Sequence, residues 1–300
     1  MKFLLAFVFL MHTALNSHAQ REITISNDGQ IIYATIRGNG KPLLLINGGP
    51  GYSSARLSTV AEELSKEFQV ITFDQRGTGK SLIKQPDSSS INVDAYARDM
   101  DAIRSYLKLS SWYVGGHSFG GLLAMAYAAR FPKRVDKLLL LSSAGINLNF
   151  INSFTDNIKN IVGEDTLKYQ LPDTVSYASW YFNMVGINAP AYVFDKSKAE
   201  VMRTILVDRT DFKPDIALLM WQDLYRLKFD LRDRLSKFNK PTLILQGGQD
   251  IVGMDTAYEI HKTIPKSEVK FIRKCGHVPW LEQPEEFYSS ITNFLKRGAK

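Results

Sequence analysis

The sequence has very little cysteine, since Cys275 is the only one among 300 residues. A single cysteine cannot form an intramolecular disulfide, so the stability of the fold must come from its hydrophobic core. The sequence also lacks a concentrated basic stripe: Lys and Arg outnumber Asp and Glu by 37 to 30, but both signs are spread along the chain. Nucleic-acid-binding proteins usually carry such a stripe, so we expect no nucleic-acid partner.

No apolar run is long enough to span a bilayer. The most apolar run, FLLAFVFLM at residues 3–11, follows Lys2 and precedes a polar stretch in which Ser17 and Ala19 stand at the positions read by a signal peptidase. We interpret residues 1–19 as a secretory signal that is cleaved near Ala19. No cysteine follows it to receive a lipid, so the sequence predicts an exported, soluble protein in the periplasm or outside the cell, without a stable membrane anchor.

Apolar residues make up 45% of the chain and arrange themselves in two alternating patterns. Short continuous apolar runs alternate with longer stretches of helical periodicity, which is typical of a parallel sheet buried on both faces. A hairpin signal at Asn27–Gly29 adds antiparallel strands at the start. We expect an α/β fold with a mostly parallel eight-stranded sheet and helices on both faces. The expected helices cover residues 58–66, 93–109, 119–130, 255–263 and 284–296.

The alternation stops between residues 145 and 238. This segment is aromatic-rich, has helical patterns interrupted by prolines and contains no comparable strand run. The strand and helix pattern resumes at residue 239. We therefore expect one core domain formed by residues 20–144 and 239–300, with residues 145–238 inserted as a helical cap.

Ser118 is the candidate nucleophile. It is the central residue of the G-x-S-x-G pattern at Gly116–Gly120, between an apolar strand and an Ala- and Leu-rich helix. This strand–turn–helix setting is the one that a nucleophile elbow requires, because the turn strains the serine backbone and leaves little room for side chains beside it. The alternative is that Ser118 only caps the helix.

A serine hydroxyl needs a base to remove its proton, and the sequence has five histidines. His12 and His18 lie in the predicted signal, and His261 lies within a predicted helix. His117 is adjacent to Ser118, and neighbouring side chains in a tight turn point apart. His277 remains, on a loop at the carboxyl end of the last strand, where parallel sheets bind their ligands.

Asp250 is the candidate acid that orients His277. It follows the preceding strand and therefore emerges at the same edge of the sheet, whereas Asp255 is better placed to cap the next helix. The chain order Ser118, Asp250, His277 is that of one large class of serine hydrolases. The oxyanion hole of such an enzyme uses two backbone N–H groups, for which we expect Phe119 and Gly49.

Gly49 belongs to the stretch NGGPG at residues 47–51, which alternatively forms only a turn with Pro50 at its corner. A second conspicuous stretch, Asp74–Gly77 (DQRG), contains an acidic and a basic residue that could form a catalytic pair. We interpret it as a structural loop beside the glycine turn.

Four stretches together resemble the proline iminopeptidase-related branch of the α/β-hydrolase superfamily: NGGPG, FDQRGTGKS, GGHSFGG followed by LAMAYAARFP, and GHVPWLEQPEEF. The resemblance covers residues 21–300 and implies a serine hydrolase or aminopeptidase with a helical cap over its site. Asn47 stands where this branch usually has His. Ile251 follows the predicted acid, where many members have a Glu that binds the substrate amine, and the predicted cap offers only Glu164 and Glu200 as other glutamates.

The predicted substrate is a small molecule or short peptide that is cleaved at an ester or amide bond through an acyl-enzyme, with no metal or organic cofactor. An N-terminal prolyl or other aminoacyl bond is one possibility, and a small apolar ester or lactone is the alternative. Trp180, Trp221 and Tyr225 are the candidate substrate-binding residues of the cap. A catalytically silent binding protein on the same scaffold is a further alternative, and the oligomeric state is left open.

Overall fold

The computed structural model describes residues 20–163, 184–208 and 210–298, so the predicted signal at residues 1–19 lies outside the described part. The described residues form one eight-stranded sheet with the strand order β1-β2-β4-β3-β5-β6-β7-β8. The strands are β1 (Arg21–Asn27), β2 (Gln30–Arg37), β3 (Pro42–Ile46), β4 (Gln69–Phe73), β5 (Trp112–His117), β6 (Val135–Leu141), β7 (Thr242–Gly247) and β8 (Ser267–Ile272).

The first two strands form the expected hairpin. Asn27 pairs with Gln30, and Asp28 and Gly29 between them have φ values of 48° and 71°. Positive φ at both central residues is the geometry of the turn that Asp-Gly favours in two-residue hairpins. Strand β2 also pairs with β4 in the antiparallel sense, and all the pairs from β4 to β8 are parallel. The predicted fold class, a mostly parallel eight-stranded sheet, is confirmed.

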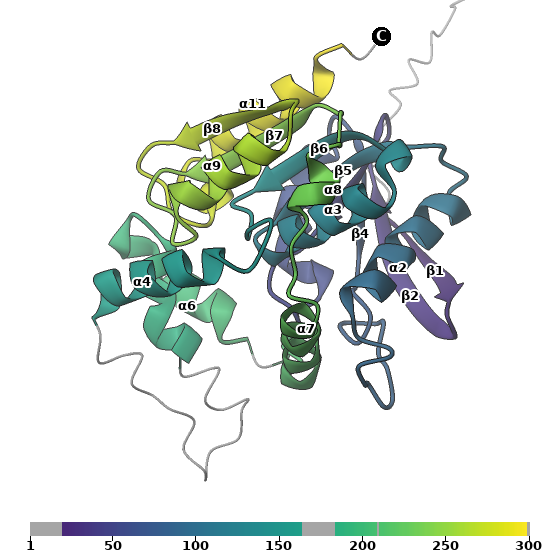
Figure 1. Cartoon of the computed structure of the whole chain (residues 1–300), viewed down its shortest axis with the longest axis horizontal. Coiled ribbons are helices and arrows are strands. Elements are labelled where there is room, and N and C mark those ends of the chain that lie inside the picture. Colours follow the sequence, from purple (N-terminus) through teal and green to yellow (C-terminus); the bar gives the residue numbers. More distant parts are fainter. Residues whose placement is uncertain (1–19, 164–183, 209, 299–300) are drawn as a thin grey trace, which may run out of the picture.

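Helices cover both faces of this sheet (Figure 1). One hydrophobic cluster joins the sheet to α2, α3 and α9, and another joins it to α1 and α11. Successive residues of a strand pack into different clusters: Leu44 belongs to the first and Leu45 to the second. Because both faces of the sheet are buried, the strands are apolar throughout. These helices are α1 (Ser58–Leu64), α2 (Val93–Tyr106), α3 (Phe119–Arg130), α9 (Met254–Thr263) and α11 (Pro284–Lys296), with the short α10 (Pro279–Glu282) before the last.

Helices α3 and α11 begin and end at the predicted residues. The prediction for α2 was too long, because this helix ends at Tyr106 rather than Leu109. Lys108 adopts a left-handed backbone with φ of 56°, and its N–H bonds the Ser105 carbonyl. A residue with positive φ cannot continue a right-handed helix, so the chain turns there.

Between β6 and β7, the described residues contain helices and no strand, apart from one isolated bridge between Asn147 and Asp230. In Figure 1, helices α4 and α6 lie near each other below the sheet, and α7 stands apart from them on the same side. The elements of this segment are α4 (Phe150–Val162), η4 (Ala189–Tyr192), η5 (Lys196–Lys198), α6 (Ala199–Leu206), α7 (Pro214–Arg226) and α8 (Arg232–Leu235). Across the described ranges, no helix is both long enough and apolar enough to cross a membrane.

Candidate active site

Ser118 lies in the tight turn between β5 and α3. Its backbone has φ of 54° and ψ of −123°, which is an unfavourable conformation for a residue with a side chain, and its side chain forms no capping hydrogen bond to α3. The alternative that Ser118 serves as a helix cap is therefore wrong. Holding a non-glycine residue in such a conformation costs about 1–3 kcal/mol, and strain of this kind concentrates at functional sites.

The glycines on either side of Ser118 allow the turn to close. A Cβ atom on Gly116 would lie 2.0 Å from the carbonyl oxygen of Gly120, and a Cβ atom on Gly120 would lie 2.3 Å from that of Ile46. Both obstacles are backbone atoms, which cannot move aside as the end of a side chain can. The turn is also held by hydrogen bonds from Ser118 N–H to the Leu141 carbonyl and from Ala144 N–H to the Ser118 carbonyl, at 3.0 and 2.9 Å.

Asp250 and His277 meet at the carboxyl edge of the sheet, as the sequence predicts from the positions of their strands. His277 Nδ1 lies 2.8 Å from Asp250 Oδ1, and both side chains are almost completely buried. Burial by itself raises the pKa of Asp250, but the adjacent His277 and the Val252 N–H outweigh that effect and hold this pKa below its ordinary value. Asp250 therefore stays ionised and fixes the orientation of the imidazole.

Two contacts hold the loop that carries His277. The His277 N–H donates to the Tyr192 carbonyl at 2.8 Å. One carboxylate oxygen of Glu282 accepts the Gly276 N–H at 2.6 Å, and the other accepts the Phe194 N–H at 2.8 Å. The segment between β6 and β7 is thus joined directly to the loop after β8, and the position of the imidazole depends on both.

His117 is next to Ser118 in the sequence but is not placed to act as its base, because its ring bonds the loop of His277. Its Nε2 donates to the backbone carbonyl of His277 at 2.9 Å, and its ring stands edge-on to Trp280. Burial, together with the nearby His277, lowers the pKa of His117 to about 3, so the ring is neutral at physiological pH. It acts as a hydrogen-bond donor to the His277 loop, a role for which the sequence carries no local signal.

Two residues with an unpaired backbone N–H line the same cavity as Ser118. Gly49, at φ of 70°, and Phe119 both line the cavity, and neither N–H has a hydrogen-bond partner within the described residues. The Gly49 turn is held from behind by Asn47, whose side-chain amide donates to the Tyr52 carbonyl at 3.0 Å, and by Gln75, which donates to the Asn47 carbonyl at 3.0 Å. Asn47 thus anchors this loop.

The rest of the DQRG loop is bonded to the core and does not line the cavity. Arg76 forms a buried ion pair with Asp99 through two hydrogen bonds of 2.7 and 2.5 Å. Asp74 accepts the Ser54 N–H and hydroxyl at 3.0 and 2.8 Å. These contacts agree with the interpretation of a structural loop.

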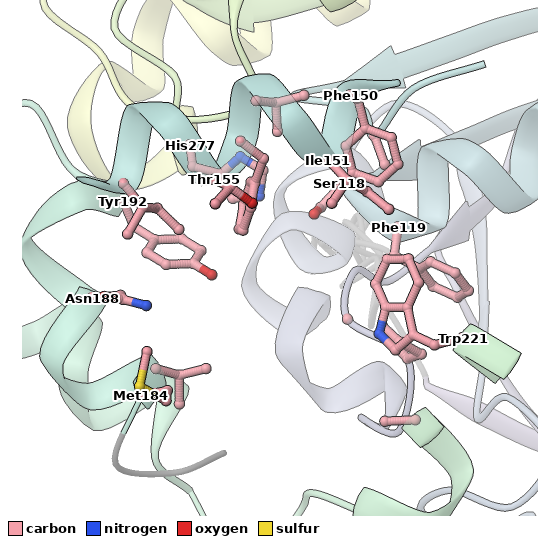
Figure 2. Close-up of a pocket in the computed structure, with 18 of the residues that line it drawn as sticks. Ser118, Phe119, Phe150, Ile151, Thr155, Met184, Asn188, Tyr192, Trp221 and His277 are labelled. Atoms are coloured by element: carbon pink, nitrogen blue, oxygen red, sulfur yellow. The ribbon is translucent and has the colours of Figure 1, made fainter. Parts of the chain in front are cut away.

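The cavity beside Ser118 has a volume of about 430 Å³, which suits a small organic molecule. Figure 2 shows the Ser118 hydroxyl and the His277 imidazole facing it. These two groups form no hydrogen bond with each other within the described residues, and catalytic hydrogen bonds are often long before substrate binds. Most of the lining is apolar, from Phe119, Phe150, Ile151, Phe154, Ile158, Met184, Val185, Ala217, Trp221 and Val252.

Trp221 and Tyr225 both line the cavity, although Tyr225 is 58% exposed. Trp180 and Glu164 lie outside the described residues. Glu200 is on the surface, paired with Arg203 at 3.2 Å, and Ile251 is fully buried against other apolar side chains. Among the described residues, no Asp or Glu lines the cavity.

Three polar residues of the cavity are not predictable from the sequence: Thr155, Asn188 and Tyr192. They lie in helical stretches without a recognisable motif, so no local signal marks them. The described ranges also contain no group of three or more His, Cys, Asp or Glu side chains that could hold a metal ion.

A twisted, mostly parallel sheet with a strained serine turn at its carboxyl edge is typical of α/β hydrolases. The model of the alpha/beta hydrolase fold family matches residues 41–284, so the chain belongs to this family. A proline iminopeptidase of Lactobacillus helveticus is 25% identical over 280 residues, which cover 86% of this chain and 91% of the relative. The resemblance to that branch is confirmed.

Other relatives carry different names. The 2-hydroxy-6-oxo-2,4-heptadienoate hydrolase of Pseudomonas putida is 27% identical over 268 residues, covering 86% of this chain and 90% of the relative. Among solved structures, a meta-cleavage product hydrolase from Pseudomonas fluorescens superimposes with a TM-score of 0.71 at 22% identity, covering 92% of this chain and 97% of the other. This structural likeness shows the fold alone.

Proposed function

We propose that the protein is a serine hydrolase that cleaves esters of apolar acids through an acyl-enzyme. Ser118 is the nucleophile, His277 the general base and acid, and Asp250 the residue that orients it. The observation that carries the proposal is the placement of Ser118, His277 and two unpaired backbone N–H groups around one apolar cavity.

The proposed reaction has two halves. His277 takes the proton of the Ser118 hydroxyl while the serine oxygen attacks the ester carbonyl, and the N–H groups of Gly49 and Phe119 stabilise the oxyanion. The intermediate collapses, the bond to the alcohol oxygen breaks, and His277 gives its proton to that oxygen. Water then attacks the acyl-enzyme: His277 takes a proton from the water and returns it to Ser118 as the acid leaves.

The lining of the cavity favours an ester over a peptide with a free amino terminus. A buried ammonium group needs a carboxylate or an equivalent set of acceptors, because an unpaired charge in an apolar site is costly. Ile251 occupies the position from which many related peptidases supply such a carboxylate, and no acidic residue of the described chain lines the cavity.

Two measurements test the proposal. A fluorophosphonate probe should label the wild type and should fail to label Ser118→Ala, whereas labelling of the exposed Ser289 or another serine in that variant would contradict the assignment. A panel of p-nitrophenyl esters, lactones and aminoacyl-naphthylamides, including the prolyl amide, should show turnover of the esters. Strong preference for the prolyl amide would establish the aminopeptidase alternative, and absence of both labelling and turnover would favour a silent binding protein.

We also propose that the protein acts outside the cytoplasm, on the strength of the signal-like residues 1–19. Expression of the full chain in a Gram-negative host, followed by mass spectrometry of the purified protein, should give a mature N-terminus at Gln20. Recovery of the intact chain from the cytoplasmic fraction alone would contradict this.

A further inference from the structure

Asn188 is a buried amide without a partner. The residue is 7% exposed, its Oδ1 atom is buried without a hydrogen bond, and its side chain forms no hydrogen bond with any other described residue. Leaving a buried polar group unsatisfied costs about 1–3 kcal/mol, so such groups are rare in folded proteins. Asn188 lines the cavity of Ser118, where a ligand could satisfy it.

Two hydroxyl groups lie on the same wall. Figure 2 shows Tyr192, from η4, and Thr155, from α4, on the side of the cavity that carries Asn188. Neither hydroxyl has a hydrogen-bond partner among the described residues. The Tyr192 ring is held by edge-on contacts with Phe154 and His277, at centroid distances of 6.4 and 5.5 Å. We call Thr155, Asn188 and Tyr192 the polar wall.

The opposite side of the cavity is mostly hydrocarbon, with the indole N–H of Trp221 as a polar group. Phe119, Phe150 and Trp221 lie across from the polar wall in Figure 2, with Ser118 between the two sides. The rings of Phe119 and Trp221 are 6.2 Å apart. Met184 lies beside Asn188, so hydrocarbon contacts are available on both sides of the nucleophile. The hydroxyl and amide groups of the polar wall lie on one side, and the aromatic rings with the Trp221 N–H lie on the other.

The mechanism decides which part of a substrate meets each side. His277 must give its proton to the departing oxygen, so the alcohol part of an ester lies on the side of His277. Tyr192 contacts the His277 ring, which places the polar wall on that side. The acyl part is left with the aromatic side, which begins at Phe119.

Resting on the proposed function, we infer that Asn188, Tyr192 and Thr155 form a leaving-group subsite for alcohols that carry a neutral hydrogen-bonding group, such as a second hydroxyl or an amide. The cavity has no Lys, Arg, Asp or Glu in its described lining, so the recognised group is uncharged. The substrate class is thus an ester that joins an apolar acid to a polar, neutral alcohol.

Matched pairs of substrates test this inference. Each pair consists of an ω-hydroxyalkyl hexanoate, with two to four carbons in the alcohol, and the n-alkyl hexanoate that has a methyl group in place of the terminal hydroxyl. The wild type should prefer the hydroxyalkyl member of at least one pair about tenfold or more in kcat/KM, the effect of one well-formed hydrogen bond.

Asn188→Leu and Tyr192→Phe should lower that preference at least fivefold, because each removes hydrogen-bonding groups while keeping most of the side-chain volume. Phe150→Leu, on the apolar side, should lower kcat/KM for both members of a pair by similar factors and leave the preference unchanged. Tyr258→Phe, at an exposed position outside this cavity, controls for the loss of a tyrosine hydroxyl as such.

The two proposals fail in different ways. If Ser118 is labelled and the alkyl esters are hydrolysed but no pair shows a preference, or if Asn188→Leu and Tyr192→Phe both retain it, the polar wall is not a leaving-group subsite and the serine hydrolase assignment stands. If the wild type hydrolyses no ester and Ser118 is not labelled, the proposed function itself is wrong.

Discussion

The Nε2 atom of His117 lies 2.9 Å from the backbone carbonyl oxygen of His277. The residue that precedes the proposed nucleophile thus supports the loop of the proposed base, 160 positions along the chain. Because the carbonyl can only accept, His117 must donate, and its neutral state with Nε2 protonated is sufficient for this bond. The geometry leads to a prediction about pH.

His117 should make the protein less stable in mild acid. Its pKa is 6.5 when unperturbed and about 3 in the folded protein. Between these two values, His117 is protonated in the unfolded chain and neutral in the folded protein. Unfolding then takes up protons, and the free energy of unfolding falls as pH falls, by up to about 1.4 kcal/mol per pH unit from this residue. The effect lies between pH 6.5 and 3 and is absent above that window.

Urea denaturation of the wild type and His117→Gln at pH 7, 6, 5 and 4 measures this contribution. The variant should be less stable at pH 7, because it loses the contact with the His277 loop, and its stability should decline less steeply toward pH 4. His261→Gln, which removes an exposed histidine, is the control for the loss of an imidazole as such. Parallel stability curves for His117→Gln and the wild type would contradict the prediction.

Asp250→Asn should lower kcat by about four orders of magnitude with little loss of stability. The amide keeps the size of the carboxylate but favours the wrong imidazole tautomer and does not stabilise the imidazolium, as in other triads of this kind. Asp255 provides the matched control, because it lies near the same loop and bonds Ser153 instead of a histidine. Ester hydrolysis by Asp255→Asn should stay within a few fold of wild type, and similar losses in the two variants would exclude Asp250 as the orienting acid.

The elements around Ser118 were predictable because their signals are local. The strained turn requires glycines at fixed spacing, the buried parallel strands require continuous apolar runs, and a loop after a strand reaches the same edge as its neighbours. The strand order, with β3 between β4 and β5, depends on tertiary packing and leaves no such local signal.

The polar wall and the hydrogen bond of His117 could not be predicted, because both depend on tertiary packing and leave no local signal in the sequence. Asn188 and Tyr192 lie in a helical segment without a recognisable motif, and only the folded chain places both at the cavity of Ser118 and Tyr192 against His277. The bond from His117 joins two loops that the sequence separates widely. Ile251, in contrast, differs in the sequence itself from the glutamate expected by resemblance, and the structure shows that it packs with Ile158 and Ala191.

Gly116→Ala should be more harmful than Gly115→Ala, although the two glycines are adjacent. A methyl group on Gly116 would meet the Gly120 carbonyl at 2.0 Å, so the serine turn would have to open. A methyl group on Gly115 would lie 3.2 Å from Leu139 Cβ and 3.3 Å from its Cδ1, which is a tight contact that a shift of a few tenths of an ångström relieves. We expect Gly116→Ala to lose about 3 kcal/mol or more of stability, or to fail to fold, and Gly115→Ala to lose about 1–2 kcal/mol. Thermal denaturation of both variants measures the two losses of stability. Equal losses would contradict the prediction and would mean that the serine turn can adapt to a methyl group.

The ion pair between Arg76 and Asp99 offers a test of what the DQRG loop does. The two side chains are 2% and 0% exposed, and Asn27 adds a third hydrogen bond to the carboxylate at 2.8 Å. Arg76→Met alone leaves Asp99 buried without its cation, which should cost about 3–5 kcal/mol. In the double variant Arg76→Met and Asp99→Leu no charge is stranded, so part of that loss should be recovered.

Urea denaturation of the wild type, both single variants and the double variant gives the coupling between the two side chains. We expect the double variant to be more stable than Arg76→Met by about 1 kcal/mol or more, and to hydrolyse esters at a rate within a few fold of wild type, since neither residue lines the cavity. Loss of hydrolysis in a well-folded double variant would instead make Arg76 part of the catalytic machinery, although it does not line the cavity.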